Sequence, residues 1–248
     1  SPLDVTAPIR LIGREAELAR LHQHWAKVIE RDTTSLLPPL LFISGEAGIG
    51  KSRLVDEFAN SLRAHGTRVL AGCCYEFERI LPYQPIVETL RSSLPSLSNS
   101  EQALVPRGFL GDASERSSEG QAALFGSVTN FLAGLSAAGP VLIVLEDLHW
   151  AAESTLQMLH YLARNLIGHP VMLIGTVRSE EVVSGSAFSG LQLALQKEKL
   201  GTLISLPPLP AADVELLVME MSGGGEWVAP LAERLYKDTE GNPFFLME

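Results

Sequence analysis

One eight-residue segment constrains this chain more than any other, because its spacing dictates a particular backbone turn. An apolar run at residues 40–44 precedes it, and residues 54–62 repeat apolar side chains at helical spacing after it. The spacing therefore predicts a loop between a buried strand and the N-terminus of a helix. The segment fits the pattern G-x-x-x-x-G-K-[ST] and consists of Gly45, Glu46, Ala47, Gly48, Ile49, Gly50, Lys51 and Ser52.

A loop of this kind is suited to hold phosphate groups. Glycine allows the backbone to turn tightly and to bring its N–H groups close to phosphate oxygens. The dipole of the following helix adds positive potential at the same point. We expect Lys51 to reach the β- and γ-phosphates of a nucleotide and the Ser52 hydroxyl to ligate Mg²⁺. Arg53, the next residue, is included among the predicted nucleotide-binding residues.

The rest of the chain alternates short apolar runs with amphipathic segments. Runs at residues 68–74, 141–145, 171–177 and 203–206 read as further buried strands. This alternation predicts an α/β fold, a P-loop NTPase three-layer sandwich around a parallel central sheet. Residues 92–119 are expected to be an irregular insertion with one short helix, and residues 180–190 a loop.

Proline-rich segments suggest the boundaries of the domains. Residues 1–9 lack periodicity and read as a linker, and residues 10–208 as the nucleotide-binding domain. The run Pro-Pro-Leu-Pro at 207–210 marks the end of that domain. Residues 209–248 are then expected to begin a small helical lid domain, with two to three helices, that the sequence does not complete.

A pair of acidic residues follows the most apolar strand. Glu146 and Asp147 come directly after residues 141–145, at the sheet edge where α/β proteins bind ligands. One carboxylate is expected to hold Mg²⁺ and the other to orient or deprotonate the attacking water, and their assignment stays open. Arg178 ends another predicted strand at the same edge, where it would contact the γ-phosphate and distinguish ATP from ADP. The alternative for Arg178 is a surface ion pair with a following glutamate.

Composition narrows the classes of function. The net charge of −10 argues against direct contact between this piece and nucleic acid, since such surfaces are usually basic. The chain has no apolar run long enough for a membrane span, and its start resembles no signal peptide. The two cysteines, Cys73 and Cys74, are adjacent in an apolar run and indicate a reducing compartment. We therefore expect a cytoplasmic protein, and the absence of an initial Met suggests a piece of a longer chain.

Several segments taken together resemble a known family. They lie at residues 12–18, 45–52, 81–85, 145–151, 175–178 and 241–244, in this order. The combination resembles the AAA ATPase module of bacterial STAND regulators, the signal-transduction ATPases with numerous domains, such as LuxR/MalT-type and antibiotic-regulator-type activators. It is also similar to origin-recognition-type AAA domains. The resemblance implies an AAA+ type fold over nearly the whole chain.

The resemblance also implies site residues and partners. Gly13 and Arg14 would lie near the adenine and ribose, and Pro243 would contact the adenine from the helical domain. Such modules switch between a closed ADP state and an ATP state that self-associates, under control of sensor and output domains in the same longer chain. This chain has no clear arginine finger, and Arg164 is a weak candidate for a contact in trans. Slow hydrolysis is therefore expected.

Two other functions remain open at this point. An active AAA+ remodelling ATPase would need a finger in trans and fast turnover. A small-molecule P-loop kinase would need a basic lid over its acceptor, and the insertion at 92–119 carries only Arg107 and Arg116. We therefore expect a regulatory module that binds ATP or ADP with Mg²⁺ and hydrolyses ATP slowly.

Overall fold

A single parallel sheet forms the centre of the computed structural model, which describes residues 10–30, 38–106 and 120–247. Within these ranges five strands pair in the order β2-β3-β4-β1-β5. All four pairings are parallel, so each connection must cross back over a face of the sheet. This arrangement confirms the predicted α/β fold. The strands are β1 (Leu40–Gly45), β2 (Arg68–Cys73), β3 (Val141–Glu146), β4 (Val171–Arg178) and β5 (Gly201–Ser205).

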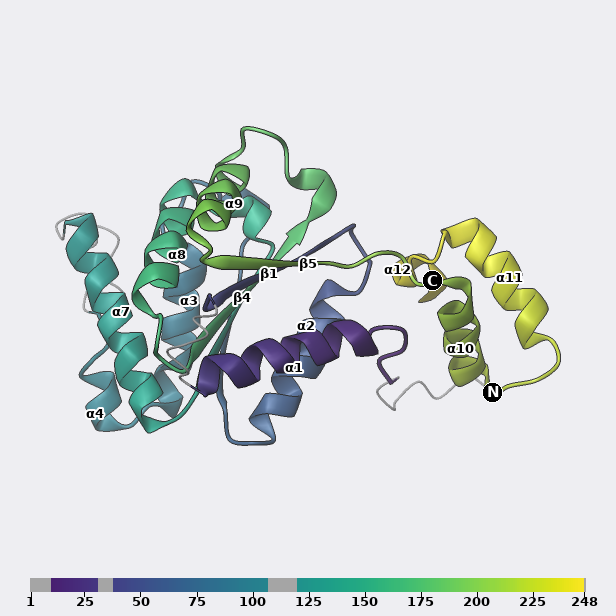
Figure 1. Cartoon of the computed structure of the whole chain (residues 1–248), viewed down its shortest axis with the longest axis horizontal. Coiled ribbons are helices and arrows are strands. Elements are labelled where there is room, and N and C mark those ends of the chain that lie inside the picture. Colours follow the sequence, from purple (N-terminus) through teal and green to yellow (C-terminus); the bar gives the residue numbers. More distant parts are fainter. Residues whose placement is uncertain (1–9, 31–37, 107–119, 248) are drawn as a thin grey trace.

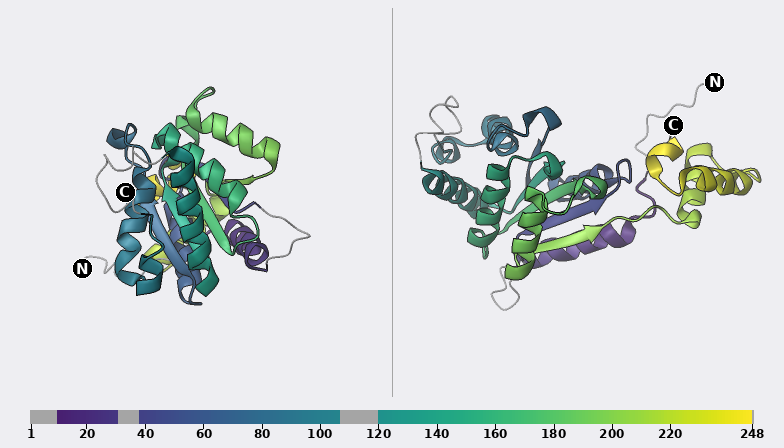
Figure 2. Two further views of the ribbon diagram at one scale, coloured as in Figure 1. Left: turned by 90° about the vertical axis from the view of Figure 1, so that its left-hand side faces the viewer. Right: turned by 90° about the horizontal axis from the view of Figure 1, so that it is seen from above.

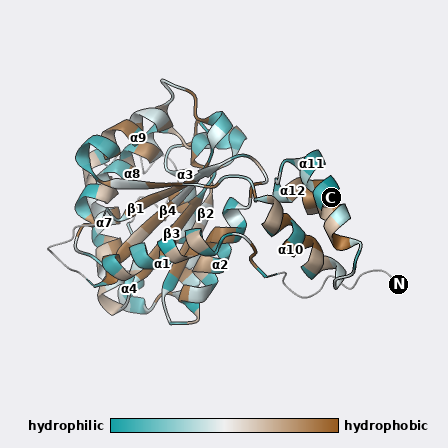
Figure 3. Cartoon of the chain, turned by 45° about the vertical axis from the view of Figure 1, so that its right-hand side comes forward, coloured by the Kyte–Doolittle hydropathy of each residue, from teal (hydrophilic) through white to brown (hydrophobic). Residues whose placement is uncertain are grey.

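Side chains alternate between the two faces of the sheet, and both faces are covered by helices (Figure 1). In β1, Leu41 and Ile43 pack with α1 (Glu15–Ile29) and α2 (Lys51–Arg63). Leu40 and Phe42 point to the opposite face and join the larger core. The strands are correspondingly largely brown, the colour of hydrophobic residues, in Figure 3. The larger core also takes in α3 (Gln84–Ser93), α7 (Gln121–Ala138), α8 (Glu153–Asn165) and α9 (Ala187–Glu198).

Strand register brings the predicted site residues to one edge of the sheet. Gly45, the last residue of β1, is paired with Arg178, the last residue of β4. On the other side of β4, Leu145 of β3 is paired with Gly175, which places Glu146 one residue further towards the same edge. The loop that follows β1, the acidic pair at the end of β3 and the arginine at the end of β4 therefore meet at the carboxyl ends of three adjacent strands.

A second group of helices lies beyond these carboxyl ends. It contains α10 (Ala211–Ser222), α11 (Val228–Thr239) and α12 (Pro243–Met247). The two longer helices pack through a small apolar core of their own, separate from the two cores of the sheet. Figures 1 and 2 show this group at one end of the molecule, joined to the sheet by the segment that follows β5.

Local structure follows the sequence for most elements, with small shifts at their ends. The expected loop at 180–190 is wrong for its last part, because α9 begins at Ala187, where the Ser186 hydroxyl accepts a hydrogen bond from the Ser189 N–H. The expected insertion contains a helical turn at Leu94–Ser96 and α4 (Asn99–Gln102). Its residues 107–119, with Arg107 and Arg116, lie outside the described residues, as does the linker at 1–9.

The helices that the structure describes are too short or too polar to cross a lipid bilayer.

Candidate functional site

The glycine-rich loop wraps around its own lysine. Gly48 and Gly50 have φ angles of 76° and 97°, a left-handed region that favours glycine. Gly50 directly precedes α2, and Lys51 is the first residue of that helix. The Lys51 Nζ donates hydrogen bonds to the carbonyl oxygens of Gly45 at 2.8 Å and Glu46 at 2.7 Å. Burial lowers the pKa of Lys51, although nearby carboxylates oppose this effect.

A small cavity of about 230 Å³ opens above this loop. Its lining includes residues of the loop, three basic residues and one acidic residue. Such a lining attracts an anion, which fits the predicted role in phosphate binding. The lining residues are Ala47, Gly48, Gly50, Lys51, Ser52, Arg53, Asp147 and Arg178.

The acidic pair splits into two positions. The Ser52 hydroxyl donates a hydrogen bond to the Glu146 carboxylate, so Glu146 lies against the start of α2. Asp147 has a φ of 56°, which turns the chain sharply after β3. The Asp147 N–H donates to the hydroxyl of Thr176 at 3.0 Å, and Thr176 is buried in β4. The Glu146 carboxylate therefore contacts the start of α2, whereas the Asp147 backbone is held by β4.

The Asp147 carboxylate lies beside a cation and a histidine. Its Oδ1 is 3.6 Å from Arg178 Nε and 3.8 Å from His149 Nε2. The Arg178 guanidinium also lies 4.7 Å from the centre of the Trp150 ring. The Arg178 N–H donates to His149 Nδ1 at 3.3 Å, which leaves the proton of a neutral imidazole on Nε2. Burial lowers the pKa of His149 and favours this neutral form.

These oxygen atoms fit a magnesium ion. Mg²⁺ prefers hard oxygen ligands and takes only one or two carboxylates, with water and substrate phosphates completing its shell. Ser52 and Glu146 already lie within hydrogen-bonding contact of each other, and Asp147 lines the same cavity. The described residues contain no cluster of three or more His, Cys, Asp or Glu side chains placed to hold a metal by themselves. A shared protein–phosphate site agrees with both observations.

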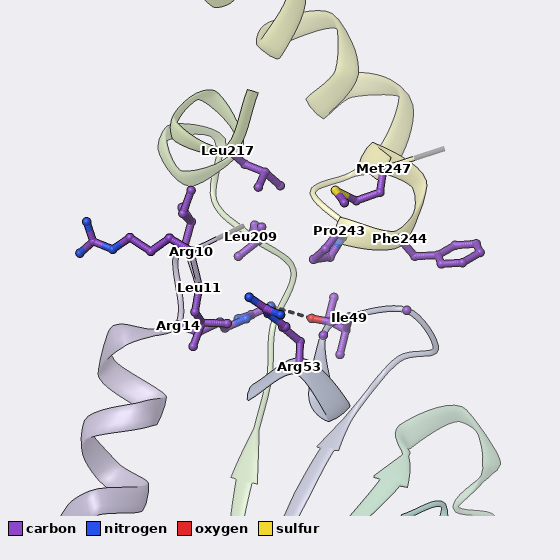
Figure 4. Close-up of a pocket in the computed structure, with 13 residues that line it drawn as sticks. Arg10, Leu11, Arg14, Ile49, Arg53, Leu209, Leu217, Pro243, Phe244 and Met247 are labelled. Carbon is purple, nitrogen blue, oxygen red and sulfur yellow. Dashed lines mark hydrogen bonds between the residues drawn. The ribbon is translucent and has the colours of Figure 1, made fainter. Parts of the chain in front are cut away.

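A larger cavity of about 440 Å³ lies on the other side of the loop, between the sheet and the second group of helices (Figure 4). Its lining is mostly aliphatic and aromatic, which suits the flat apolar faces of a nucleobase. The loop residues Gly48 and Gly50 and the side chain of Arg53 line both cavities. The remaining lining residues are Arg10, Leu11, Ile12, Arg14, Ile49, Leu209, Leu217, Pro243, Phe244 and Met247.

Arg14 lines this cavity, but its guanidinium is directed at backbone carbonyls. Its Nη2 donates to the carbonyl oxygens of Ile49 at 3.2 Å and Pro207 at 2.7 Å, and the first of these bonds is drawn in Figure 4. Its Nη1 lies 3.7 Å from Glu17. Only 4% of Arg14 is exposed. Arg14 thus ties the glycine-rich loop to the segment after β5.

The second group of helices contacts the loop directly. The Asn242 side-chain amide donates to the Ala47 carbonyl at 3.0 Å, and its oxygen accepts from the Phe244 N–H at 3.1 Å. A Cβ atom on Gly48 would collide with the side chain of Phe244. Gly48 therefore serves the contact between the two parts as well as the turn itself.

The structure brings most of the predicted residues together. Pro243 lines the larger cavity beside Arg14, whereas Gly13 packs against Leu209 and Asp213, and its predicted contact with a nucleotide stays a prediction. Arg164 lies in the last turn of α8, and its Nε is 3.6 Å from the Glu198 carboxylate. Because α8 begins near the carboxyl ends of the strands, Arg164 lies towards the opposite edge of the sheet, away from the site.

Sequence reasoning missed four residues at the site: Thr176, Glu180, Asn242 and Phe244. The sequence offered a signal for three of these residues. Thr176 is a polar residue within an apolar strand, and Asn242 and Phe244 belong to the segment at 241–244. Glu180 has no local signal, because its partner is Ala47, 133 residues away.

The parallel sheet and the glycine-rich loop are those of the P-loop NTPase fold. A model of the family described as "AAA ATPase domain" matches residues 10–174, and the chain belongs to this family. An uncharacterized protein of Rhizobium meliloti (strain 1021) is 27% identical over 200 residues, which cover 68% of this chain and 18% of that protein. The chain therefore spans about a fifth of this relative.

Solved structures show the same fold. Cdc6p from Pyrobaculum aerophilum matches 100% of this chain and 61% of its own with a TM-score of 0.62, at 14% identity. The ORC2 protein of Aeropyrum pernix, solved in ADPNP–ADP complexes, matches 98% of this chain and 62% of its own with a TM-score of 0.59, at 12% identity. At these identities the likeness shows a shared AAA+ fold.

Proposed function

We propose that this chain is an ATP-binding, slowly hydrolysing switch module of a larger signal-transduction protein, with a transcriptional regulator as the favoured context. ATP or ADP would bind with its phosphates in the smaller cavity and its adenine in the larger one. In this proposal residues 10–208 form the nucleotide-binding domain and residues 209–248 begin a helical lid, as the sequence predicts.

The contact between Asn242 and Ala47 supports this function best. It joins the lid to the phosphate-binding loop itself, 195 residues away in sequence. The larger cavity is likewise lined from both parts, by Ile49 on one side and Pro243 on the other. Because a ligand shifts a conformational equilibrium only through different contacts in the two states, a nucleotide held between loop and lid can bias their relative position.

The residues at the site can perform a slow hydrolysis. Lys51 and the loop N–H groups would hold the phosphates, and Arg178 would offset charge at the terminal phosphate. Glu146 and Ser52 would hold Mg²⁺, which would supply positive charge to offset that of the phosphates. Asp147 would orient or deprotonate the attacking water. Its ion pair with Arg178 must loosen for this role, which favours slow turnover.

Steady-state hydrolysis separates this proposal from its alternatives. We expect turnover well below about 1 s⁻¹, since arginine fingers supply roughly 10³–10⁵ in rate and the part of the chain that the structure describes offers no clear one. Phosphate release from the purified chain with Mg²⁺ and ATP is the measurement, with Lys51→Ala as the control for contaminating ATPases. Sustained turnover above about 1 s⁻¹ would favour a remodelling ATPase instead.

The full-length protein should also change its self-association with the bound nucleotide. We expect the full-length chain to self-associate with a non-hydrolysable ATP analogue and not with ADP, as measured by light scattering after size-exclusion chromatography. Equal masses in the two nucleotides would contradict a switch that works by self-association.

A further inference from the structure

One carboxylate at the site has no role in the function proposed above. Glu180 belongs to the 3₁₀ turn Ser179–Glu181, which directly follows β4. Its Oε1 accepts a hydrogen bond from the Ala47 N–H at 2.8 Å. Its Oε2 accepts one from the Ser179 hydroxyl at 3.2 Å. Both oxygens are therefore engaged, and one of them takes a backbone donor of the phosphate-binding loop.

This carboxylate accepts a hydrogen bond from the part of the loop that is remote from α2. In loops of this kind the lysine reaches the β- and γ-phosphates, whereas the backbone N–H groups nearer the helix cradle the α- and β-phosphates. Ala47 precedes the helix by four residues and lines the smaller cavity together with Arg178. Glu180 thus presents an anionic oxygen on the γ side of the loop.

We propose that Glu180 is a specificity-determining residue that disfavours nucleoside triphosphates relative to diphosphates by holding the Ala47 N–H in place of a γ-phosphate oxygen. The inference rests on the proposed nucleotide binding and adds a preference to it. A diphosphate leaves the Glu180–Ala47 hydrogen bond intact. A triphosphate must break it and bring a second anion close to the carboxylate.

The turn that contains Glu180 also contacts a second segment at the surface of the molecule. Glu181, next to Glu180 in the same turn, lies 3.9 Å from Arg79 Nη2 in the segment before α3. Displacement of Glu180 by a γ-phosphate would therefore move a turn that contacts a second surface segment. Glu181 carries the same charge as its neighbour but pairs away from the loop, which makes it a matched control.

The test compares two ligands in four proteins. Calorimetry with Mg²⁺ gives the dissociation constants of ADP and of the β,γ-methylene analogue of ATP for wild type, Glu180→Gln, Glu180→Ala and Glu181→Gln. We expect the ratio of the triphosphate dissociation constant to the diphosphate dissociation constant to fall about tenfold in both Glu180 variants. A tenfold change corresponds to the free energy of about one hydrogen bond to an ionised group. The ratio should not change in Glu181→Gln.

Each other outcome decides a different question. If ADP binds and the Glu180 variants keep the wild-type ratio, the inference is wrong while the proposed function stands. An equal fall in Glu181→Gln would mean that the charge of the turn acts without the contact to Ala47, and would also overturn the inference. If wild type binds neither nucleotide, the proposed function fails and the inference with it.

Discussion

Replacing Arg14 by alanine distinguishes two roles for this residue. The family resemblance implies that Arg14 lies near the adenine and ribose, whereas its guanidinium donates hydrogen bonds to the carbonyl oxygens of Ile49 and Pro207. If the second role dominates, Arg14→Ala should destabilise the protein even without nucleotide. If the first dominates, the loss should appear only as weaker nucleotide binding.

The magnitude follows from the contacts. Two hydrogen bonds to a charged donor contribute about 1.5–3 kcal/mol each to stability. Part of this gain is offset, because burial of the guanidinium is itself costly, as the lowered pKa of Arg14 shows. We therefore expect Arg14→Ala to reduce the free energy of unfolding by about 3 kcal/mol. With a urea m-value of about 3 kcal/mol per molar, the midpoint would fall by about 1 M.

Urea unfolding of the nucleotide-free protein, followed by circular dichroism, measures this effect. Arg10→Ala is the matched control, because Arg10 lines the same cavity but is exposed, and its midpoint should stay close to wild type. The reasoning is refuted if Arg14→Ala unfolds at the wild-type midpoint while its affinity for ADP falls tenfold or more, on the order of 1.4 kcal/mol.

Three further predictions concern other residues. Lys51→Ala should abolish or greatly weaken triphosphate binding in calorimetry, because it removes the charge that reaches the β- and γ-phosphates; unchanged affinity would reject the loop assignment. Glu146→Gln and Asp147→Asn should each bind nucleotide but hydrolyse ATP more slowly, by on the order of tenfold or more; full activity in both would remove the pair from the mechanism. Glu101 should make stability depend on pH, because hydrogen bonds from Arg68 and, to a smaller extent, from Ser98 lower its pKa from 4.5 to about 2. Because the pKa of Glu101 is lower in the folded than in the unfolded protein, its contribution to stability is complete above about pH 4.5 and is lost as pH falls towards 2. Arg68→Gln should therefore make the urea midpoint less dependent on pH between these two values.

Local patterns predicted the elements of this fold well. An apolar run such as residues 141–145 becomes a strand buried on both faces, and the helix after the glycine-rich loop repeats its apolar side chains every three or four residues. The start of α9 was missed because its signal is a single capping serine, Ser186, in a segment with weak periodicity. Such a cap acts over three residues and is easily hidden by polar neighbours.

For the candidate site, too, some features follow from the local sequence and others from the tertiary structure. The sequence by itself determined the phosphate-binding loop, the acidic pair and the strand that ends in Arg178, because each depends on spacing within a few residues. Tertiary structure alone decided the strand order and two hydrogen bonds. These bonds run from Arg14 to the Pro207 carbonyl oxygen and from the Ala47 N–H to the Glu180 carboxylate. These partners lie more than a hundred residues apart, so they meet only after the sheet has packed, and no local pattern specifies which donor will face which acceptor.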